Sequence, residues 1–197
     1  RSKDFFYVTS FSELGLSEPL CRALAGAGYA APTPIQSKAF PHIAAGRDLL
    51  GVAQTGTGKT AAFALPLLQQ LRLGGGGDGR KDGPWVLVLA PTRELAVQIG
   101  AEFGRFGKAL GLRHAVVIGG VGIRPQIRAI AAGPESLIAT PGRLLDLLRQ
   151  RHVRLQHVHH FVLDEADRML DMGFLPQVRQ LLAALPAERQ SMLFSAT

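Results

Sequence analysis

The amino-acid sequence predicts an α/β fold in which a mostly parallel central sheet carries helices on both faces. Six apolar segments recur along the chain with helical patterns between them, and this alternation is typical of successive β-α-β units. The segments are continuously hydrophobic, as expected for strands that are buried on both faces. They are residues 48–53, 85–90, 114–120, 136–140, 160–165 and 191–197.

Short polar or glycine-containing motifs stand at the ends of these strands. In chain order the motifs are "TGTGKT", "PTREL", "GG", "TPGR", "DEAD" and "SAT". Because the carboxyl ends of parallel strands meet at one edge of a sheet, where α/β proteins bind ligands, we expect all six motifs to share that edge.

Composition limits the class of protein. The chain has 197 residues, of which 47% are hydrophobic, and this suffices for one α/β domain with a well-formed core. It carries 22 Lys and Arg against 15 Asp and Glu, a net charge of +7. This charge favours a polyanionic partner, although a basic protein without such a partner is an alternative that charge alone leaves open.

The compartment is predicted to be cytoplasmic. Cys21 is the single cysteine, which excludes an intrachain disulfide and a cysteine zinc cluster and fits a reducing setting. The most apolar runs are shorter than the roughly 20 residues of a membrane-spanning helix, and no secretory signal opens the chain. We therefore expect no membrane contact. Since the chain starts at Arg1 rather than Met, we expect a fragment of a longer protein, and we expect it to be monomeric.

The segment "AQTGTGKT" nearly matches the phosphate-loop pattern G-x-x-x-x-G-K-[ST], with Ala53 in place of the first glycine. Gly56 and Gly58 permit the backbone conformations in which several N–H groups converge on a phosphate. Lys59 supplies a positive charge, and Thr60, at the start of the next helix, can place its hydroxyl on magnesium. A glycine-rich turn followed by an accidental Lys-Thr pair is the alternative interpretation.

The segment "VLDEAD" brings carboxylates to the same predicted edge. Buried strand ends seldom carry several carboxylates without a compensating cation. Asp164 is therefore expected to bind magnesium, directly or through water, and Glu165 to orient and activate an attacking water. The alternative is an acidic helix N-terminus that only complements the helix dipole.

Taken in order, "AQTGTGKT", "PTREL", "TPGR", "DEAD" and "SAT" resemble the motifs of the DEAD-box family of ATP-dependent RNA helicases. The resemblance spans residues 11–197, and in this family the phosphate motif begins with alanine, as it does here. It implies an N-terminal RecA-like P-loop domain over residues 1–197. Residues 1–37 would form an adenine-reading flanking region and residues 38–197 the P-loop core.

The resemblance also implies ATP and magnesium as ligands. The segment "GYAAPTPIQ" is similar to the adenine-reading motif, in which the Gln36 amide pairs with adenine while Phe11 stacks on the base. A core contact for Phe11 and a solvated helix face for Gln36 are the alternatives. The implied catalytic residues are Lys59, Asp164 and Glu165, and the implied magnesium ligands are Thr60 and Asp164. The implied nucleotide-binding residues are Phe11, Gln36, Thr55, Gly56, Thr57, Gly58, Lys59 and Thr60.

RNA is the partner that the resemblance implies. "PTREL" and "TPGR" both place an arginine where a helix is predicted to begin, and helix N-termini offer unpaired N–H groups to phosphates. Such contacts to the RNA backbone carry no sequence information. N-capping by the two threonines is the alternative. The implied RNA-binding residues are Pro91, Thr92, Arg93, Gly119, Gly120, Thr140, Gly142 and Arg143.

The last motif is implied to couple the nucleotide site to strand separation. In the family, Ser195 and Thr197 lie near Asp167, and a second RecA-like domain, with its arginine finger, completes the site. That domain is not part of this sequence. A DNA translocase, a non-helicase ATPase and a nucleotide-binding module without turnover are the alternatives.

The remaining patterns receive simpler interpretations. "RMLDMGF" and "GRLLDLL" are similar to the bacterial RhlE-type subgroup of the family. The cluster of Met169, Leu170, Met172 and Phe174 is expected to be core packing. Residues 74–83 read as a flexible linker, and the histidines of "HVRLQHVHH" as solvated or packed side chains rather than metal ligands.

Overall fold

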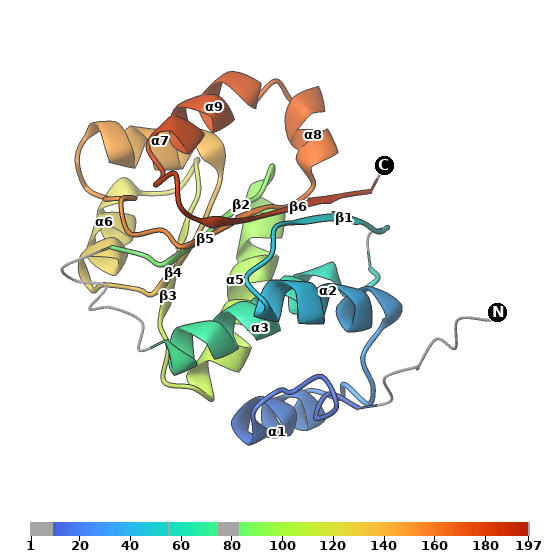
Figure 1. The fold of residues 1–197 in the computed structure, drawn as a ribbon. Coiled ribbons are helices and arrows are strands. Elements are labelled where there is room, and N and C mark those ends of the chain that lie inside the picture. Colours follow the sequence, from blue (N-terminus) through green and yellow to red (C-terminus); the bar gives the residue numbers. More distant parts are fainter. Residues whose placement is uncertain (1–9, 55, 75–82, 197) are drawn as a thin grey trace.

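The computed structural model describes residues 10–54, 56–74 and 83–196, which form a six-stranded sheet between two layers of helices (Figure 1). All strand pairs are parallel, and the strand order is β1-β6-β5-β2-β4-β3. All six predicted strands are confirmed. Their bounds are β1 Leu49–Val52, β2 Val86–Leu89, β3 His114–Val117, β4 Ser136–Ala139, β5 His160–Leu163 and β6 Gln190–Ser195.

Helices connect the strands and cover the sheet on both sides. On one face, β2 contributes Val86 and Val88 to a core shared with α1, α2, α3 and α5. On the other face, Leu87 and Leu89 belong to a second core, against which α6, α7 and α9 pack. The described helices are α1 Glu18–Gly26, α2 Pro34–Ala44, α3 Lys59–Leu73, α5 Arg93–Lys108, α6 Ile123–Ala131, α7 Pro141–Arg149, α8 Ala166–Asp171 and α9 Leu175–Ala183.

Helix α3 is the most enclosed helix of the fold. Residues 61–68 are all buried, because α3 lies against the sheet and also packs on α2 and α5. A helix that is apolar around its whole circumference is suited only to such a position. The predicted phosphate loop is thereby attached to a rigid element. The expected division at residue 37 falls inside α2.

Gln190 joins the amino-terminal side of the sheet to the helix layer. Its Nε2 donates to the carbonyl oxygens of Ile43 at 3.0 Å and Arg47 at 2.8 Å, and its Oε1 lies 2.9 Å from His160 Nδ1. Buried amides need such partners because each unsatisfied polar group costs about 1–3 kcal/mol. This network ties the segment before β1 to β5 and β6. Within the described ranges, no helix is both long and apolar enough to span a bilayer.

Candidate functional site

The carboxyl ends of the strands gather most of the predicted site residues, as expected. The parallel register pairs Val52 with Ser195 and Leu89 with Leu163, so the loops that follow these strands emerge side by side. A cleft of about 510 Å³ opens there between the phosphate loop, β5 and α5. Its lining includes the predicted Gly56, Gly58, Lys59, Thr60, Asp164 and Glu165.

The phosphate loop turns into α3 through two glycines with left-handed backbone conformations. Gly56 has a φ of 82° and Gly58, the N-cap of α3, a φ of 88°. A Cβ atom at Gly58 would also lie 2.5 Å from Gln36 Nε2, so both conformation and space require glycine. The N–H groups of the first turn of α3 have no partners within the helix and are suited to bind an anion.

Lys59 begins α3 and places its ammonium in this cleft. The residue is only 6% exposed, and among the described residues its Nζ has no hydrogen-bond partner. A buried ammonium without a partner is costly, because the lost hydration is not replaced. The site therefore favours a bound anion at Lys59.

Asp164 follows β5 and faces the same cleft. It is 2% exposed, and its Oδ1 accepts a hydrogen bond from the Glu165 N–H at 3.0 Å. Burial raises the pKa of Asp164 from 3.8 to about 6, and the nearby charge of Lys59 opposes this rise. A buried carboxylate of this kind is stabilised by a cation.

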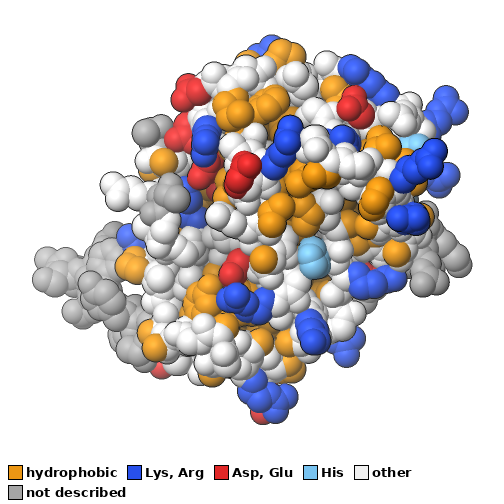
Figure 2. Space-filling view, turned by 180° about the vertical axis from the view of Figure 1, so that it is seen from behind, with side chains coloured by type: hydrophobic (Ala, Val, Ile, Leu, Met, Phe, Trp, Pro, Cys, Tyr) orange, Lys and Arg blue, Asp and Glu red, His pale blue; other side chains and the backbone are white. Residues whose placement is uncertain are grey.

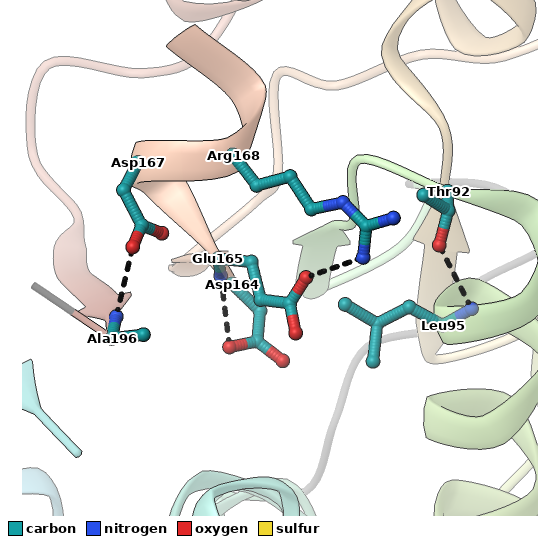
Figure 3. A network of polar contacts seen from close by, with 7 residues as sticks. All are labelled: Thr92, Leu95, Asp164, Glu165, Asp167, Arg168 and Ala196. Carbon is teal, nitrogen blue, oxygen red and sulfur yellow. Dashed lines mark hydrogen bonds and ion pairs between the residues drawn. The ribbon is translucent and has the colours of Figure 1, made fainter. Parts of the chain in front are cut away.

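Glu165 is held in an unfavourable backbone conformation. Its φ of 50° and ψ of 54° lie in the left-handed region, which costs a non-glycine residue about 1 kcal/mol or more. Its carboxylate pairs with Arg168 at 3.4 Å, and it points toward the same space as Asp164 (Figure 3). Strain of this kind is typical of functional positions, where the side chain must be aimed away from its relaxed direction.

Two hydrogen bonds connect the cleft to the end of β6. The N–H of Ala196 donates to Asp167 Oδ2 at 3.1 Å (Figure 3), and the N–H of Ala53 donates to the Ser195 carbonyl at 3.0 Å. The predicted coupling residues Asp167 and Ser195 therefore lie together. Thr197, and Thr55 of the phosphate loop, fall outside the described residues. Thr57 closes the loop by donating its hydroxyl to the Gln54 carbonyl at 2.7 Å.

The two predicted adenine-binding residues are buried. Phe11 is 6% exposed and belongs to the core that α1 and α3 share. Gln36 is 2% exposed; its Oε1 accepts the Thr33 N–H at 2.9 Å, and its Nε2 donates to the Gly58 carbonyl at 3.2 Å. Gln36 thus caps α2 and supports the phosphate loop. Its Nε2 carries a second N–H and its Oε1 a second lone pair, so neither partner has to be given up for a further hydrogen bond.

A second cleft, of about 410 Å³, lies beside the first one at the same edge of the sheet. Seven of the eight residues expected at the RNA line it, and Gly120 lies directly under the guanidinium of Arg93. A Cβ atom at Gly120, whose φ is 74°, would overlap Arg93 Nη1, so the flexible end of the Arg93 side chain would have to move. The seven are Pro91, Thr92, Arg93, Gly119, Thr140, Gly142 and Arg143.

Helix starts form much of this second cleft. Thr92 is the N-cap of α5, and its Oγ1 accepts the Leu95 N–H at 3.2 Å (Figure 3). Thr140 is the N-cap of α7 but makes no side-chain cap bond, so the alternative interpretation of N-capping by side chains holds only at Thr92. Arg143 Nη1 donates to the Val121 carbonyl at 3.1 Å, which joins α7 to the loop before α6.

Several cleft residues are not predicted by the sequence motifs. Met172 and Phe174 line the second cleft, and Met172 is 47% exposed, so the expectation of core packing is wrong for Met172 and for the exposed Leu170. It is confirmed for Met169, which is buried. Met172 follows the end of α8 at Asp171, and within α8 only Met169 is buried against the core, which leaves Leu170 exposed.

The first cleft also contains side chains with no predicted role. Tyr29, which stands in "GYAAPTPIQ", lines it and donates to Glu102 Oε2 at 3.2 Å, and Gln98 lies one helical turn before Glu102 on α5. The sequence signals are the place of Tyr29 in that motif and the spacing of Gln98 and Glu102 after "PTREL". In the part of the chain that the structure describes, no three His, Cys, Asp or Glu side chains are grouped to hold a metal ion.

Comparison with known proteins places this arrangement in a family. The profile described as DEAD/DEAH box helicase matches residues 33–197. The chain belongs to this family. DEAD-box proteins therefore provide the frame for both clefts, and the RecA-like fold agrees with the crystal structure of a DEAD box protein from the hyperthermophile Methanococcus jannaschii. That structure superposes with a TM-score of 0.86 at 37% identity, over 96% of this chain and 50% of the other.

The sequence similarity to curated DEAD-box relatives extends over nearly the whole chain. DEAD-box ATP-dependent RNA helicase 30 of Arabidopsis thaliana is 48% identical over 95% of this chain, and ATP-dependent RNA helicase dbp2 of Schizosaccharomyces pombe is 48% identical over 96%. DEAD-box ATP-dependent RNA helicase CshA of Bacillus cereus is 45% identical over 96%. The chain spans 32%, 34% and 35% of these relatives. They give no support to the RhlE-type subgroup.

The raised pKa of Asp164 predicts how the stability of the ligand-free protein depends on pH. An acid with a raised pKa in the folded state holds its proton more tightly there. The free energy of unfolding should therefore fall as pH rises from about 4 to about 6. Well above this window, the titration of Asp164 should contribute no further change. Since the Asp164→Asn variant lacks this titration, it should gain up to about 3 kcal/mol over the parent across that window.

Urea unfolding of parent and variant over this pH range measures the difference. The exposed Asp146→Asn variant serves as the control and should follow the parent. Parallel curves for Asp164→Asn and the parent would show that Asp164 does not titrate in this window.

Proposed function

We propose that this chain is the ATP-binding and RNA-binding first half of a DEAD-box RNA helicase that couples ATP hydrolysis to local unwinding of RNA duplexes or remodelling of RNA–protein complexes. The observation that carries the proposal is the buried ammonium of Lys59, which has no partner among the described residues and faces Asp164 and Glu165 in one cleft. A basic second cleft lies at the same edge of the sheet.

The first cleft fits a nucleotide with magnesium. The α3 N-terminus and Lys59 would hold the phosphates, which satisfies the orphaned ammonium. Thr60 and Asp164 would hold magnesium, partly through water, and this ion would neutralise phosphate charge. Magnesium commonly uses one or two carboxylates together with phosphates and water, a set that Asp164 and a bound phosphate would supply.

Glu165 is the proposed general base. Its carboxylate is held next to Asp164 by the strained backbone and by Arg168. From there it would orient an attacking water and accept its proton. Phe11 and Gln36 are the proposed adenine-reading residues, and the Gln36 amide has a second N–H and a second oxygen lone pair beyond the two bonds that it makes.

The second cleft is the proposed RNA site. Arg93 and Arg143 supply charge, and the N-termini of α5 and α7 supply N–H groups, which together suit phosphates irrespective of base sequence. Met172 and Phe174 add an apolar wall that can pack on sugar or base. The hydrogen bond from Ala196 to Asp167 is the proposed link by which a change at the nucleotide reaches the chain beyond β6.

The test of the nucleotide site is Lys59→Met. We expect the affinity for ADP and ATP to fall at least about tenfold, because a charge-assisted hydrogen bond contributes about 1.5–3 kcal/mol. Stability of the ligand-free protein should not fall, since the variant replaces a buried charge by an apolar chain of similar length. Titration calorimetry and urea unfolding give the two readings, with the exposed Lys108→Met as the control. Undiminished affinity would contradict the assignment.

The proposal that this chain holds only half of the catalytic site is tested by the activity of the chain alone. We expect it to bind ADP but to release phosphate from ATP negligibly, with or without single-stranded RNA. An arginine supplied from a second domain is worth about 10³ to 10⁵ in rate. Phosphate release is then measured again after a second RecA-like domain is fused to the chain. Strong stimulation of phosphate release by RNA in the chain alone would contradict the proposal that it holds only half of the catalytic site. Continued inactivity of the fusion would contradict the proposed helicase function.

Gly120 is expected to act on RNA binding through Arg93. Because a Cβ atom would displace the guanidinium but leave its charge, Gly120→Ala should lower RNA affinity by no more than Arg93→Ala. The double variant should lose little more, since both changes remove one contact. Gly111→Ala is the matched control, because its φ of 71° imposes similar strain but nothing lies within 4 Å. Additive losses in fluorescence anisotropy would contradict this coupling.

A further inference from the structure

Positive charge is concentrated in one part of the chain. Residues 113–160 contain seven arginines, no lysine and only two acidic residues, Glu135 and Asp146. This quarter of the sequence therefore accounts for +5 of the net charge of +7. Of the seven arginines, only Arg143 lines the proposed RNA cleft. Arg113 pairs with Glu135 and Arg149 with Gln180, which leaves Arg124, Arg128, Arg151 and Arg154 to be explained.

Helix α6 carries two of these arginines at a cost to its own stability. Arg124 and Arg128 lie one turn apart and are exposed, and neither has a hydrogen-bond or ion-pair partner among the described residues. Like charges at this spacing destabilise a helix by about 0.2–0.5 kcal/mol. Arg124 also stands in the first turn, where the helix dipole disfavours a cation. A bound anion would relieve both effects.

The two ends of α6 touch two basic surfaces. At its start, Arg143 binds the Val121 carbonyl, one residue before the N-cap Gly122. At its end, Ile130 and Ala131 line a hollow of about 430 Å³. Arg151, His152 and Arg154 line the same hollow. Helix α6 thus forms a bridge of about 13 Å between the proposed RNA cleft and this hollow.

The surface agrees with a continuous basic strip. In Figure 2, Lys and Arg side chains are frequent along the right-hand side, which is the side of α6 after the rotation from Figure 1. We define the arginine track as Arg124, Arg128, Arg151 and Arg154. All four are exposed, and all four are arginines, whose planar guanidinium suits phosphate oxygens.

We propose that the arginine track holds the RNA strand where it leaves the second cleft, an inference that rests on the proposed function. RNA fits better than a membrane surface. The apolar residues of α6, Ile123, Ile127 and Ile130, pack on the second core, so the helix has no apolar face left for a bilayer. Contacts of this kind lengthen the bound RNA segment without adding sequence preference.

The test compares short and long RNA. Fluorescence anisotropy gives the affinities of the chain for a single-stranded oligonucleotide that fills only the cleft, about 6 nucleotides, and for one of about 20 nucleotides. For the variant Arg124→Gln/Arg128→Gln we expect the ratio of long-RNA to short-RNA affinity to fall about 5-fold to 10-fold. The slope of log affinity against log salt for the long RNA should decrease by about 1.4, or about 0.7 for each lost phosphate contact.

The matched control is Arg47→Gln/Arg72→Gln, which removes the same charge at two exposed sites away from the track. It should leave the ratio and the slope unchanged. Circular dichroism and thermal unfolding check that each variant is folded. Should the α6 variant fail to fold, Arg151→Gln/Arg154→Gln outside the helix tests the same track, with the same expected fall.

The outcomes separate the two proposals. If the parent does not bind the short RNA, or if Arg93→Ala and Arg143→Ala leave that binding intact, the proposed function is overturned. If the parent binds short RNA through these residues but the track variants keep the long-RNA ratio, the track is overturned. It is also overturned if the control lowers the ratio equally, or if the track variants weaken binding of a polyglutamate chain but not of long RNA.

Discussion

The buried ammonium of Lys59 is the constraint on which the site depends. It exists because Lys59 opens α3, the helix that the sheet, α2 and α5 enclose, so its side chain has little access to water. The charge is left without a hydrogen-bond partner in the described structure, and it opposes the rise in the pKa of Asp164. An arrangement of this kind is unfavourable because the lost hydration of the ammonium is not replaced, and under the proposed function phosphate and a cation would compensate for it.

A strained residue and close contacts surround this charge. Glu165 is held in a left-handed conformation, Gly58 has no room for a side chain beside Gln36, and Asp167 is tied to the backbone after β6. The phosphate loop itself begins at a backbone bond to Ser195. The first and last strands of the fold are therefore connected at the cleft, because β1 and β6 are neighbours in the sheet although almost 140 residues apart.

The two clefts share one edge because every strand is parallel. Each strand end delivers a loop to that edge, and the helix that follows starts there with unpaired N–H groups and a partial positive charge. This explains why anion-binding features recur at α3, α5 and α7, and why Arg93 and Arg143 lie together. The charge of α6 extends the same positive surface away from the edge.

Local sequence by itself determined much of this protein. Continuous apolar runs identified all six strands. The expected burial on both faces is found in β2 and β4, whereas Leu50 and Val52 of the edge strand β1 are exposed. Because parallel strand ends meet, the motifs after them, such as Lys59 with Asp164, could be assigned to one edge from their order along the chain. Tertiary structure alone decided the strand order, the burial of Phe11 and the two partners of Gln36. It also decided the close approach of the Arg93 guanidinium to Gly120 and the exposure of Met172. These features depend on contacts between segments far apart in the chain, whose distances no local pattern encodes.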